Sequence, residues 1–530
     1  MTKKILLLPF FIVFFIKVYS QGNFSGELMV NSDFYQRDEA IGAVNTPHYD
    51  NLLSSTDAWF SLLYTNHDIN LDVGIRMDMF NNSNLHNPGT PYNGIGIGRW
   101  FVRKRFQNVT LEGGYIYEQF GSGISFRTYE DRSLGIDNAL FGMSVKYEPI
   151  ENLMITGLAG VQKNRFDLYN PIIQGVNLEY FISSEEGNLT MVPGVALVNR
   201  TLDQSSMNLI VNTIETYPEE ERFVPRYNTF VASAYNSMDI GAFNVYLEGA
   251  VKTNEAIRTA DNRLRDRPGN VLYGVVGYSR PGFGASFQAK RTENFVFRTS
   301  PNEALLDGMI GFIPPTARQQ HRRLIARYAA ATQELEELAF NLDLSYVPVR
   351  GYTLGFNAAE IRDFSDDLLF REYFLDLTIR KSRKWTGVAG IQYMQYNQAV
   401  YEEKPGEPMV EAITPFVELT YRFNRRHSIR VEAEYQYNEQ DFGSWVYGLI
   451  EYNIAPRWSF AVSDMYNYAP NESKDTEALH YYSLFASYTA GAHRFTTSYV
   501  RQVEGVICTG GVCRFEPAFS GVKFQLTTSF

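Results

Sequence analysis

Apolar and polar side chains alternate along most of this chain, from about residue 24 to the last residue. A period of two places successive side chains on opposite faces of a β-strand. The pattern is clearest at 69–80, 338–346 and 429–437. The chain is therefore predicted to consist of strands that each have one apolar face and one polar face.

The links between these strands distinguish a membrane barrel from a large soluble sandwich, because short and long links alternate strictly. The short links are expected at 66–68, 106–108, 149–151, 184–186, 237–239, 280–282, 349–351, 382–384, 424–426, 455–457 and 490–492. The long links include 36–51, 81–92, 121–136, 204–224, 253–269 and 296–320. Short turns on one side and long loops on the other are typical of outer-membrane barrels, whose turns are periplasmic.

The number of turns predicts the number of strands. Eleven hairpin turns and two free ends give about 24 strands, with a range of 22 to 26. The stretch 321–347 can be one long strand entered from a loop or two short strands, and only the first choice preserves the alternation. The predicted fold class is all-β: a single large antiparallel transmembrane β-barrel over residues 21–530, with long extracellular loops and short periplasmic turns.

Both ends of the chain carry signals of export. Two lysines precede the apolar stretch 5–16, and small residues follow it, so 1–20 is predicted to be a cleaved signal peptide. At the other end, the alternating stretch 522–530 ends in Phe530, which resembles the assembly signal of outer-membrane barrels. We therefore expect the bacterial outer membrane as the location, with its lipid and, during biogenesis, the barrel-assembly machinery as partners.

Composition narrows the classes of function. The 530 residues have a formal net charge of -11, which argues against a nucleic-acid partner because phosphate binding requires clustered Lys and Arg. Seven scattered histidines give no recognisable catalytic order, so the chain is not expected to be an enzyme and no cofactor is expected. Mean hydropathy is slightly negative, which excludes helical membrane spans in the mature chain.

One predicted loop differs in composition from a solvated loop tip. It combines two glycines with charges of both signs, namely Gly121, Gly123, Arg127, Glu130, Asp131, Arg132 and Asp137. We expect it to fold back into the barrel lumen and pair with charged wall residues, although an ordinary structured extracellular loop is an alternative. The lumen wall residues expected from the alternation include Asp72, Arg76, Asp78, Glu112, Glu118, Arg430, Glu432 and Glu434.

The two cysteines, Cys508 and Cys513, lie in the last long loop with two glycines between them. A disulfide at a hairpin tip is expected in an oxidising compartment. A metal site is not expected, because this spacing without nearby His or further Cys does not supply four ligands.

Several short motifs resemble an uncharacterised family of outer-membrane proteins from Bacteroidetes, a domain of unknown function. The motifs are 120–124, 127–130, 134–140, Trp445, 451–452, 480–482 and 508–514. This resemblance implies a barrel in the cell envelope and brings no substrate with it.

Three functions remain open from the sequence. The first is a passive or loop-gated pore for hydrophilic solutes. The second is a non-conducting barrel subunit that docks another envelope protein of a secretion or assembly complex. The third is a surface adhesin or receptor that acts through its loops.

Overall fold

The chain folds as one closed antiparallel barrel in a computed structural model, which describes residues 22–87, 89–184, 187–304, 306–471, 477–509 and 511–530. The predicted signal peptide 1–20 lies outside these residues. The barrel has 24 strands, as predicted, and closes where β1 (Gly22–Tyr35) pairs with β31 (Phe519–Ser529).

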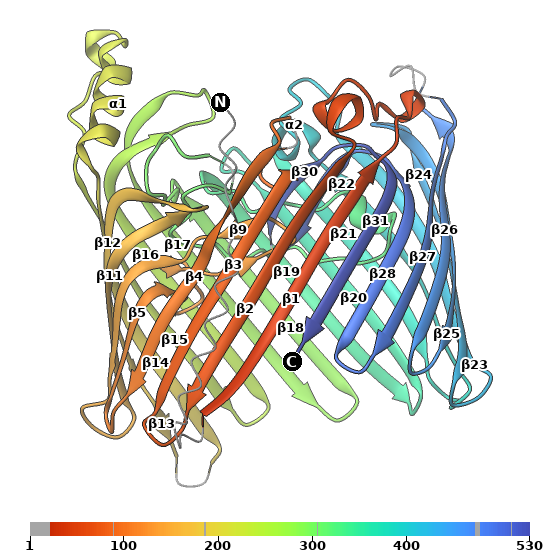
Figure 1. Cartoon of the computed structure of the whole chain (residues 1–530), viewed down its shortest axis with the longest axis horizontal. Helices are drawn as coiled ribbons and strands as arrows, with labels where there is room; N and C mark the ends of the chain where they lie inside the picture. The colour runs from red at the N-terminus through yellow and green to blue at the C-terminus, as the bar shows by residue number, and fades with distance from the viewer. Residues whose placement is uncertain (1–21, 88, 185–186, 305, 472–476, 510) are drawn as a thin grey trace, which may run out of the picture.

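The remaining strands of the wall follow the chain order around the barrel (Figure 1). They are β2 (Ser54–Asn66), β3 (Leu71–Ser83), β4 (Tyr92–Arg105), β5 (Val109–Ile116), β10 (Leu140–Tyr147), β11 (Leu153–Asn164), β12 (Asp167–Tyr180) with its continuation β13 (Ile182–Ser183), β14 (Leu189–Thr201), β15 (Asn228–Ile240), β16 (Phe243–Arg258), β17 (Leu264–Arg280), β18 (Phe283–Glu293), β19 (Glu336–Val349), β20 (Tyr352–Arg362), β21 (Leu368–Ile379), β22 (Trp385–Tyr396), β23 (Val410–Arg422), β24 (His427–Asn438), β25 (Gly443–Ile454), β26 (Trp458–Pro470), β27 (His480–Ala490) and β28 (His493–Gln502).

Most strands turn an apolar face outward and a polar face inward, the reverse of a soluble protein. In β3, Met77 is 48% exposed on the outer surface, whereas the neighbouring Arg76 and Asp78 are buried inside the barrel. An apolar outer surface and a polar interior are what a barrel needs when lipid surrounds it and water fills it.

Ten of the eleven predicted turns lie at or next to one rim, shown at the bottom of Figure 1, where β1 begins and β31 ends, and the remaining one, 184–186, includes two residues outside the described part of the chain. One turn was misplaced: 237–239 belongs to β15, and the chain reverses at Gly241, whose φ of 59° glycine adopts readily. At the other rim, the predicted long link 253–269 is mostly strand. The hairpin between β11 and β12 is also tight there, because Arg165 adopts a left-handed φ of 57°.

Helices occur only in the links among the described residues. They are α1 (Gln204–Glu215), α2 (Gln398–Tyr401) and the short turns η1 (Glu39–Ile41), η2 (His48–Leu52), η3 (Glu219–Glu221) and η4 (Ile325–Arg327). The helix α1 begins at Asp203, whose carboxylate accepts the N–H groups of Ser205 and Ser206, and it projects above the rim in Figure 1. No described helix is long and apolar enough to cross a membrane.

Three links turn into the barrel instead of outward. The lumen loop (residues 117–139) contains the short strands β6 (Gln119–Phe120), β7 (Phe126–Arg127), β8 (Glu130–Asp131) and β9 (Ile136–Asp137). The crossing segment (294–335) joins β18 to β19. The inner hairpin (505–516) pairs β29 (Gly505–Thr509) with β30 (Val512–Glu516).

The lumen loop has its own apolar core against the inner wall. Its side chains Phe120, Ile124 and Phe126 are fully buried and pack on inward-facing Leu158, Ile173, Val198 and Val231 of the wall. Strand β14 is therefore apolar on both faces, since Val195 and Leu197 point outward while Val198 points inward. Alternation weakens where a wall strand is covered by protein on the inside.

The ambiguous stretch 321–347 contains one strand entered from a loop, which was the first of the two choices. The strand is shorter than expected, because residues 321–335 belong to the crossing segment and β19 begins only at Glu336. Short and long links still alternate between the two rims, because the extra residues lengthen one link and do not add a strand.

Candidate functional site

The lumen loop is held to the wall by a buried cluster of charges around Arg76 of β3. The Arg76 guanidinium lies 2.6 Å from a carboxylate oxygen of Asp78, 2.8 Å from Glu130 and 2.5 Å from Asp137. Lys163 of β11 pairs with Asp137 from the other side. The structure therefore joins predicted loop residues to two predicted wall residues and adds Lys163, which the sequence did not single out.

Asp137 is the centre of this cluster. Besides its two cationic partners it accepts the hydroxyl of Tyr117 at 2.7 Å. Burial alone would raise the pKa of Asp137, but Lys163 and Arg76 outweigh burial and hold the pKa below its usual value. The carboxylate is thus charged at neutral pH and neutralises two buried cations.

The other predicted residues of the lumen loop have local structural roles. Gly121 and Gly123 adopt φ of 53° and 101°, which explains why glycine is present at both. The guanidinium of Arg127 lies between two rings, 4.4 Å from that of Tyr129 and 4.1 Å from that of Phe312. These residues fix the path of the loop.

Two further charges of the lumen loop make short contacts. The carboxylate of Asp131 accepts the N–H of Ser133 at 2.9 Å and closes a turn. Arg132 lies 2.7 Å from Glu130 and 3.6 Å from Glu27 of the wall. The side chains of these two residues stabilise the tip of the loop rather than reach across the lumen.

Two residues that were expected to pair with the loop charges pair elsewhere, Glu112 with Arg103 and Glu118 with Lys146, and Glu118 lies at the base of the lumen loop rather than in the wall. Asp72, a further predicted wall residue, pairs with Arg105. These pairs join neighbouring strands, or the base of the loop to β10, because alternation shows that a residue faces inward but not at which height the loop passes.

The crossing segment, which we expected only as an extracellular link over 296–320, is the larger infolded element. Wall side chains hold its backbone at several points: Lys252 donates to the carbonyl of Val296 at 2.5 Å, and Lys290 to that of Pro314 at 2.7 Å. These two lysines also pair with Glu255 and Glu337 at 2.6 and 2.8 Å.

The far end of the crossing segment is anchored on β24, through the predicted wall residues Glu432 and Glu434. Arg322 lies 2.6 Å from Glu432, while the two oxygens of Glu434 accept the N–H groups of Arg323 and Leu324, both at 2.9 Å. Arg430, the third predicted residue of this strand, pairs with Glu451 at 3.3 Å and does not reach the crossing segment. Anchors from β16 to β24 therefore tie one link to a large part of the circumference.

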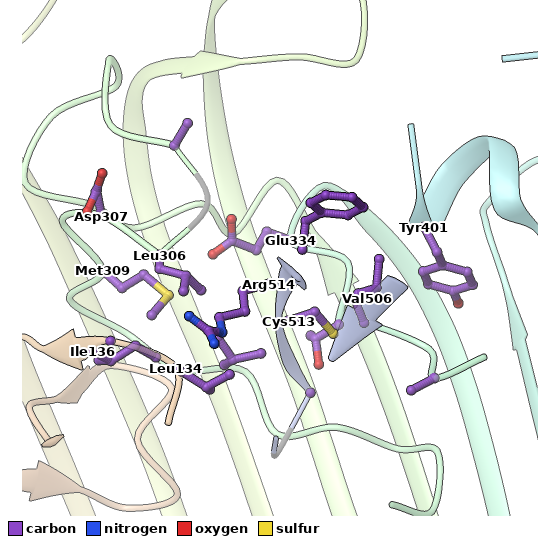
Figure 2. Close-up of a pocket in the computed structure, with 18 of the residues that line it drawn as sticks. Leu134, Ile136, Leu306, Asp307, Met309, Glu334, Tyr401, Val506, Cys513 and Arg514 are labelled. Atoms are coloured by element: carbon purple, nitrogen blue, oxygen red, sulfur yellow. The ribbon is translucent and has the colours of Figure 1, made fainter. Parts of the chain in front are cut away.

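A cavity of about 1980 Å³ remains between the three infolded segments and the wall. Figure 2 shows residues of all three facing it: Leu134 and Ile136 of the lumen loop, Leu306 and Met309 of the crossing segment, and Arg514 of the inner hairpin. Its lining mixes apolar patches with charges of both signs, so it suits a polar solute with some apolar surface better than a purely apolar one.

The inner hairpin spans this cavity. Arg514 pairs with Glu516 at 2.6 Å and donates to the carbonyl of Leu85 at 3.1 Å, and Thr332 donates its N–H to the carbonyl of Gly511 at 3.1 Å. The hairpin register sets Cys508 directly opposite Cys513. The side chain of Cys508 lies outside the described part of the chain, so the disulfide remains a prediction.

The described residues hold no group of three or more His, Cys, Asp or Glu side chains arranged for a metal ion. His86 lies buried among cations in the link between β3 and β4. Burial, together with Arg165 and Arg514, lowers its pKa to about 4. His86 is therefore neutral at physiological pH.

Comparison with known proteins gives a family and general likenesses of fold. No curated protein matches the chain. Among solved structures, the siderophore receptor PirA from Pseudomonas aeruginosa is similar with a TM-score of 0.42 at 8% identity, over 96% of this chain and 80% of the receptor.

Two further structures are similar at the same level. The translocation pore of the P pilus usher PapC has a TM-score of 0.44 at 8% identity, over 96% of this chain and 99% of the pore chain. OccK1 from Pseudomonas aeruginosa has a TM-score of 0.36 at 9% identity, over 96% of this chain and 98% of its own. The model of one family matches residues 1–530 in full, and the chain belongs to that family, the family of unknown function DUF6029.

Proposed function

We propose that the protein is an outer-membrane channel of a Gram-negative bacterium, through which hydrophilic solutes pass along a route narrowed by the lumen loop and the crossing segment. The observation that carries the proposal is the cavity between ion-paired infolded segments inside a barrel with an apolar outer surface. A barrel of 24 strands is wider than the 16 to 18 strands that already leave an aqueous channel in porins. Infolded segments therefore set the size of the route.

The way in which the segments are held favours a route that can open. The crossing segment is held by ion pairs and hydrogen bonds, for example those of Arg322 and Glu434, and by buried apolar side chains such as Phe297, Ile310 and Leu324. The polar contacts exchange with water at a small net free-energy cost, about 0.5–1.5 kcal/mol for a typical hydrogen bond. Release of the stretch between Pro314 and Arg323, whose contacts are mainly polar, would widen the lumen without disturbing the wall.

Single-channel recording in planar bilayers tests this proposal. We expect the wild-type protein to conduct, and a variant in which a short Gly/Ser linker replaces 308–333 to conduct more. A control variant shortened at 204–224, which projects outside the barrel, should conduct like the wild type. Absence of channels in both the wild type and the linker variant would rule out the channel.

Export and assembly are part of the same proposal. We infer that residues 1–20 are removed as a signal peptide and that Phe530 serves as the assembly signal. The backbone N–H and C=O of Phe530 bond to Gly26 at 3.0 and 2.8 Å, and its ring is 62% exposed on the outside of the seam. N-terminal sequencing of the protein from fractionated membranes, and loss of barrel assembly when Phe530 is deleted, test the two inferences.

A docking role is the second candidate, because the link 202–227 projects above the rim. It exposes Leu209 and Val224, which are 56% and 86% accessible, beyond the barrel. A partner or surface ligand could bind there. Co-purification of a stoichiometric partner in mild detergent tests this role. Loss of the partner when 204–224 is trimmed, with conductance unchanged, would favour docking, either instead of transport or in addition to it.

A further inference from the structure

The crossing segment contains a stretch whose net charge is opposite in sign to that of the whole chain. The whole protein carries a net charge of -11, yet residues 308–333 contain no Asp or Glu. The same stretch contains four arginines and one histidine, namely Arg318, His321, Arg322, Arg323 and Arg327. The lumen of an acidic barrel is thus crossed by a basic segment.

Acidic residues of the wall and of the link between β24 and β25 already engage three of these arginines. Arg322 lies 2.6 Å from Glu432, and Arg327 lies 3.7 Å from Asp441 with its guanidinium 4.5 Å from the Trp445 ring. Arg318 reaches Asp343 at 3.8 Å and is more exposed. These three guanidinium groups hold the segment in place.

Arg323 is different because its backbone is anchored while its side chain has no polar partner among the described residues. Its N–H and that of Leu324 donate to Glu434, and the Leu324 side chain is fully buried beside Trp445 and Met465. The neighbours on both sides therefore point to the wall. The side chain of Arg323 points to the cavity, is exposed there, and makes no ion pair or hydrogen bond with any described residue.

The surroundings of Arg323 disfavour its positive charge. Desolvation inside the barrel and the neighbouring Arg327 lower its pKa. Two carboxylates favour the charge of Arg323 from farther away, but both already have partners. Glu434 accepts backbone N–H groups, and Glu516 pairs with Arg514. An anion at this guanidinium would relieve an unfavourable charge without displacing an existing partner.

We propose that Arg323 anchors a binding site for oxyanionic solutes, carboxylates or phosphates, in the cavity between the infolded segments. A guanidinium presents paired N–H donors that match the two oxygens of such groups, and a fixed backbone reduces the entropy lost on binding. Arg318 adds positive potential because it is exposed to the same cavity. The site itself does not depend on conduction. Only its role in selecting the solutes that pass rests on the proposed channel.

Calorimetry on the full-length protein in detergent tests the site, with sodium phosphate and sodium succinate as probes in a background of sodium chloride. We expect at least one probe to bind and Arg323→Gln to weaken that binding about tenfold or more. Arg323→Lys keeps the charge and should retain most of the affinity. The control is Arg350→Gln, which removes the same charge from a turn at the opposite rim and should bind like the wild type.

The outcomes separate the site from the channel. Binding of phosphate alone or succinate alone would support the site and identify its ligand. No binding of either probe, or equal binding by wild type and Arg323→Gln, would overturn it. An equal loss in Arg350→Gln would also overturn it, because net charge would then explain the effect. If the protein conducts, the reversal potential in a KCl gradient should shift toward cation selectivity in Arg323→Gln.

Discussion

Single charged residues decide how the interior of this barrel is organised. Asp137 neutralises Arg76 and Lys163 together, so removing its charge leaves two buried cations with reduced compensation. Breaking a buried ion pair from one side typically costs about 3–5 kcal/mol, whereas an exposed pair is worth less than about 1 kcal/mol. Buried and exposed pairs of the same barrel should therefore respond very differently to substitution.

The first prediction compares two such substitutions. Asp137→Asn should loosen the lumen loop and make 117–139 susceptible to protease in the folded barrel. Glu118→Gln removes the carboxylate that pairs with Lys146. Because this ion pair is more exposed, the variant should leave the loop resistant to protease. Limited proteolysis followed by mass spectrometry measures both, and equal cleavage of the two variants would contradict the assigned role of Asp137.

The second prediction concerns pH. Because the folded state holds the pKa of Asp137 below its usual value, the carboxylate stabilises the loop at pH values above its ordinary pKa near 3.9. This stabilisation is lost as the pH falls further and the folded-state carboxylate takes up its proton. Protease resistance of the loop should thus persist at pH 6 and fall below about pH 4, with a smaller change in Asp137→Asn.

At the scale of elements, the crossing segment and the inner hairpin are held by contacts that the chain makes over long sequence separations. Glu434 is bound to residues more than one hundred positions away, through two N–H groups at 2.9 Å. An amide at this position offers one acceptor oxygen and sets an NH₂ group against a backbone donor. A single conservative substitution should therefore release the end of the segment.

The third prediction follows from that geometry. Glu434→Gln should increase single-channel conductance and expose 308–333 to protease. The matched change Glu451→Gln removes a carboxylate that pairs with Arg430 but does not touch the crossing segment, and it should alter neither property. Unchanged protease resistance in Glu434→Gln would show that the other anchors suffice.

The fourth prediction concerns the inner hairpin. Residues that lie directly opposite in an antiparallel pair have Cα atoms about 4.5–5.5 Å apart, within the range of a disulfide. Cys508 and Cys513 are such a pair. The unfolded, unreduced protein should therefore show no reactive thiol in an alkylation assay, and two after reduction. Alkylation without reductant would disprove the bond.

At the scale of the whole molecule, the sequence predicted the barrel wall better than the segments that fold into its lumen. Alternation and link lengths predicted 24 strands and two kinds of rim, because both are local properties of the chain. The charged composition of 121–137 indicated an infolded loop for the same reason. The crossing segment was missed, because its anchors, such as Lys290 and Glu432, are inward-facing wall residues like many others. The absence of acidic residues from 308–333 was the available signal.

The fifth prediction tests the assignment of the two faces of the wall. Ile450 is 54% exposed on the outer surface of β25, and the adjacent Leu449 faces inward opposite Glu432. Ile450→Arg should lower the free energy of unfolding in lipid vesicles by about 2–4 kcal/mol if it lies near the bilayer midplane. Leu449→Arg should cost clearly less. Denaturant titration of both variants measures the difference.

The apolar inner wall beneath the lumen loop has a consequence for motion. Swinging this loop outward would expose Phe120, Phe126 and their wall partners to water, at roughly 1.5–3 kcal/mol for each large side chain. Withdrawing the whole crossing segment would carry the same kind of cost, because Phe297 and Ile310 are buried in the same cluster and Leu324 in another. The stretch from Pro314 to Arg323 is held mainly by polar contacts, which water can replace, so a blocker that fixes the width of the route should bind this stretch.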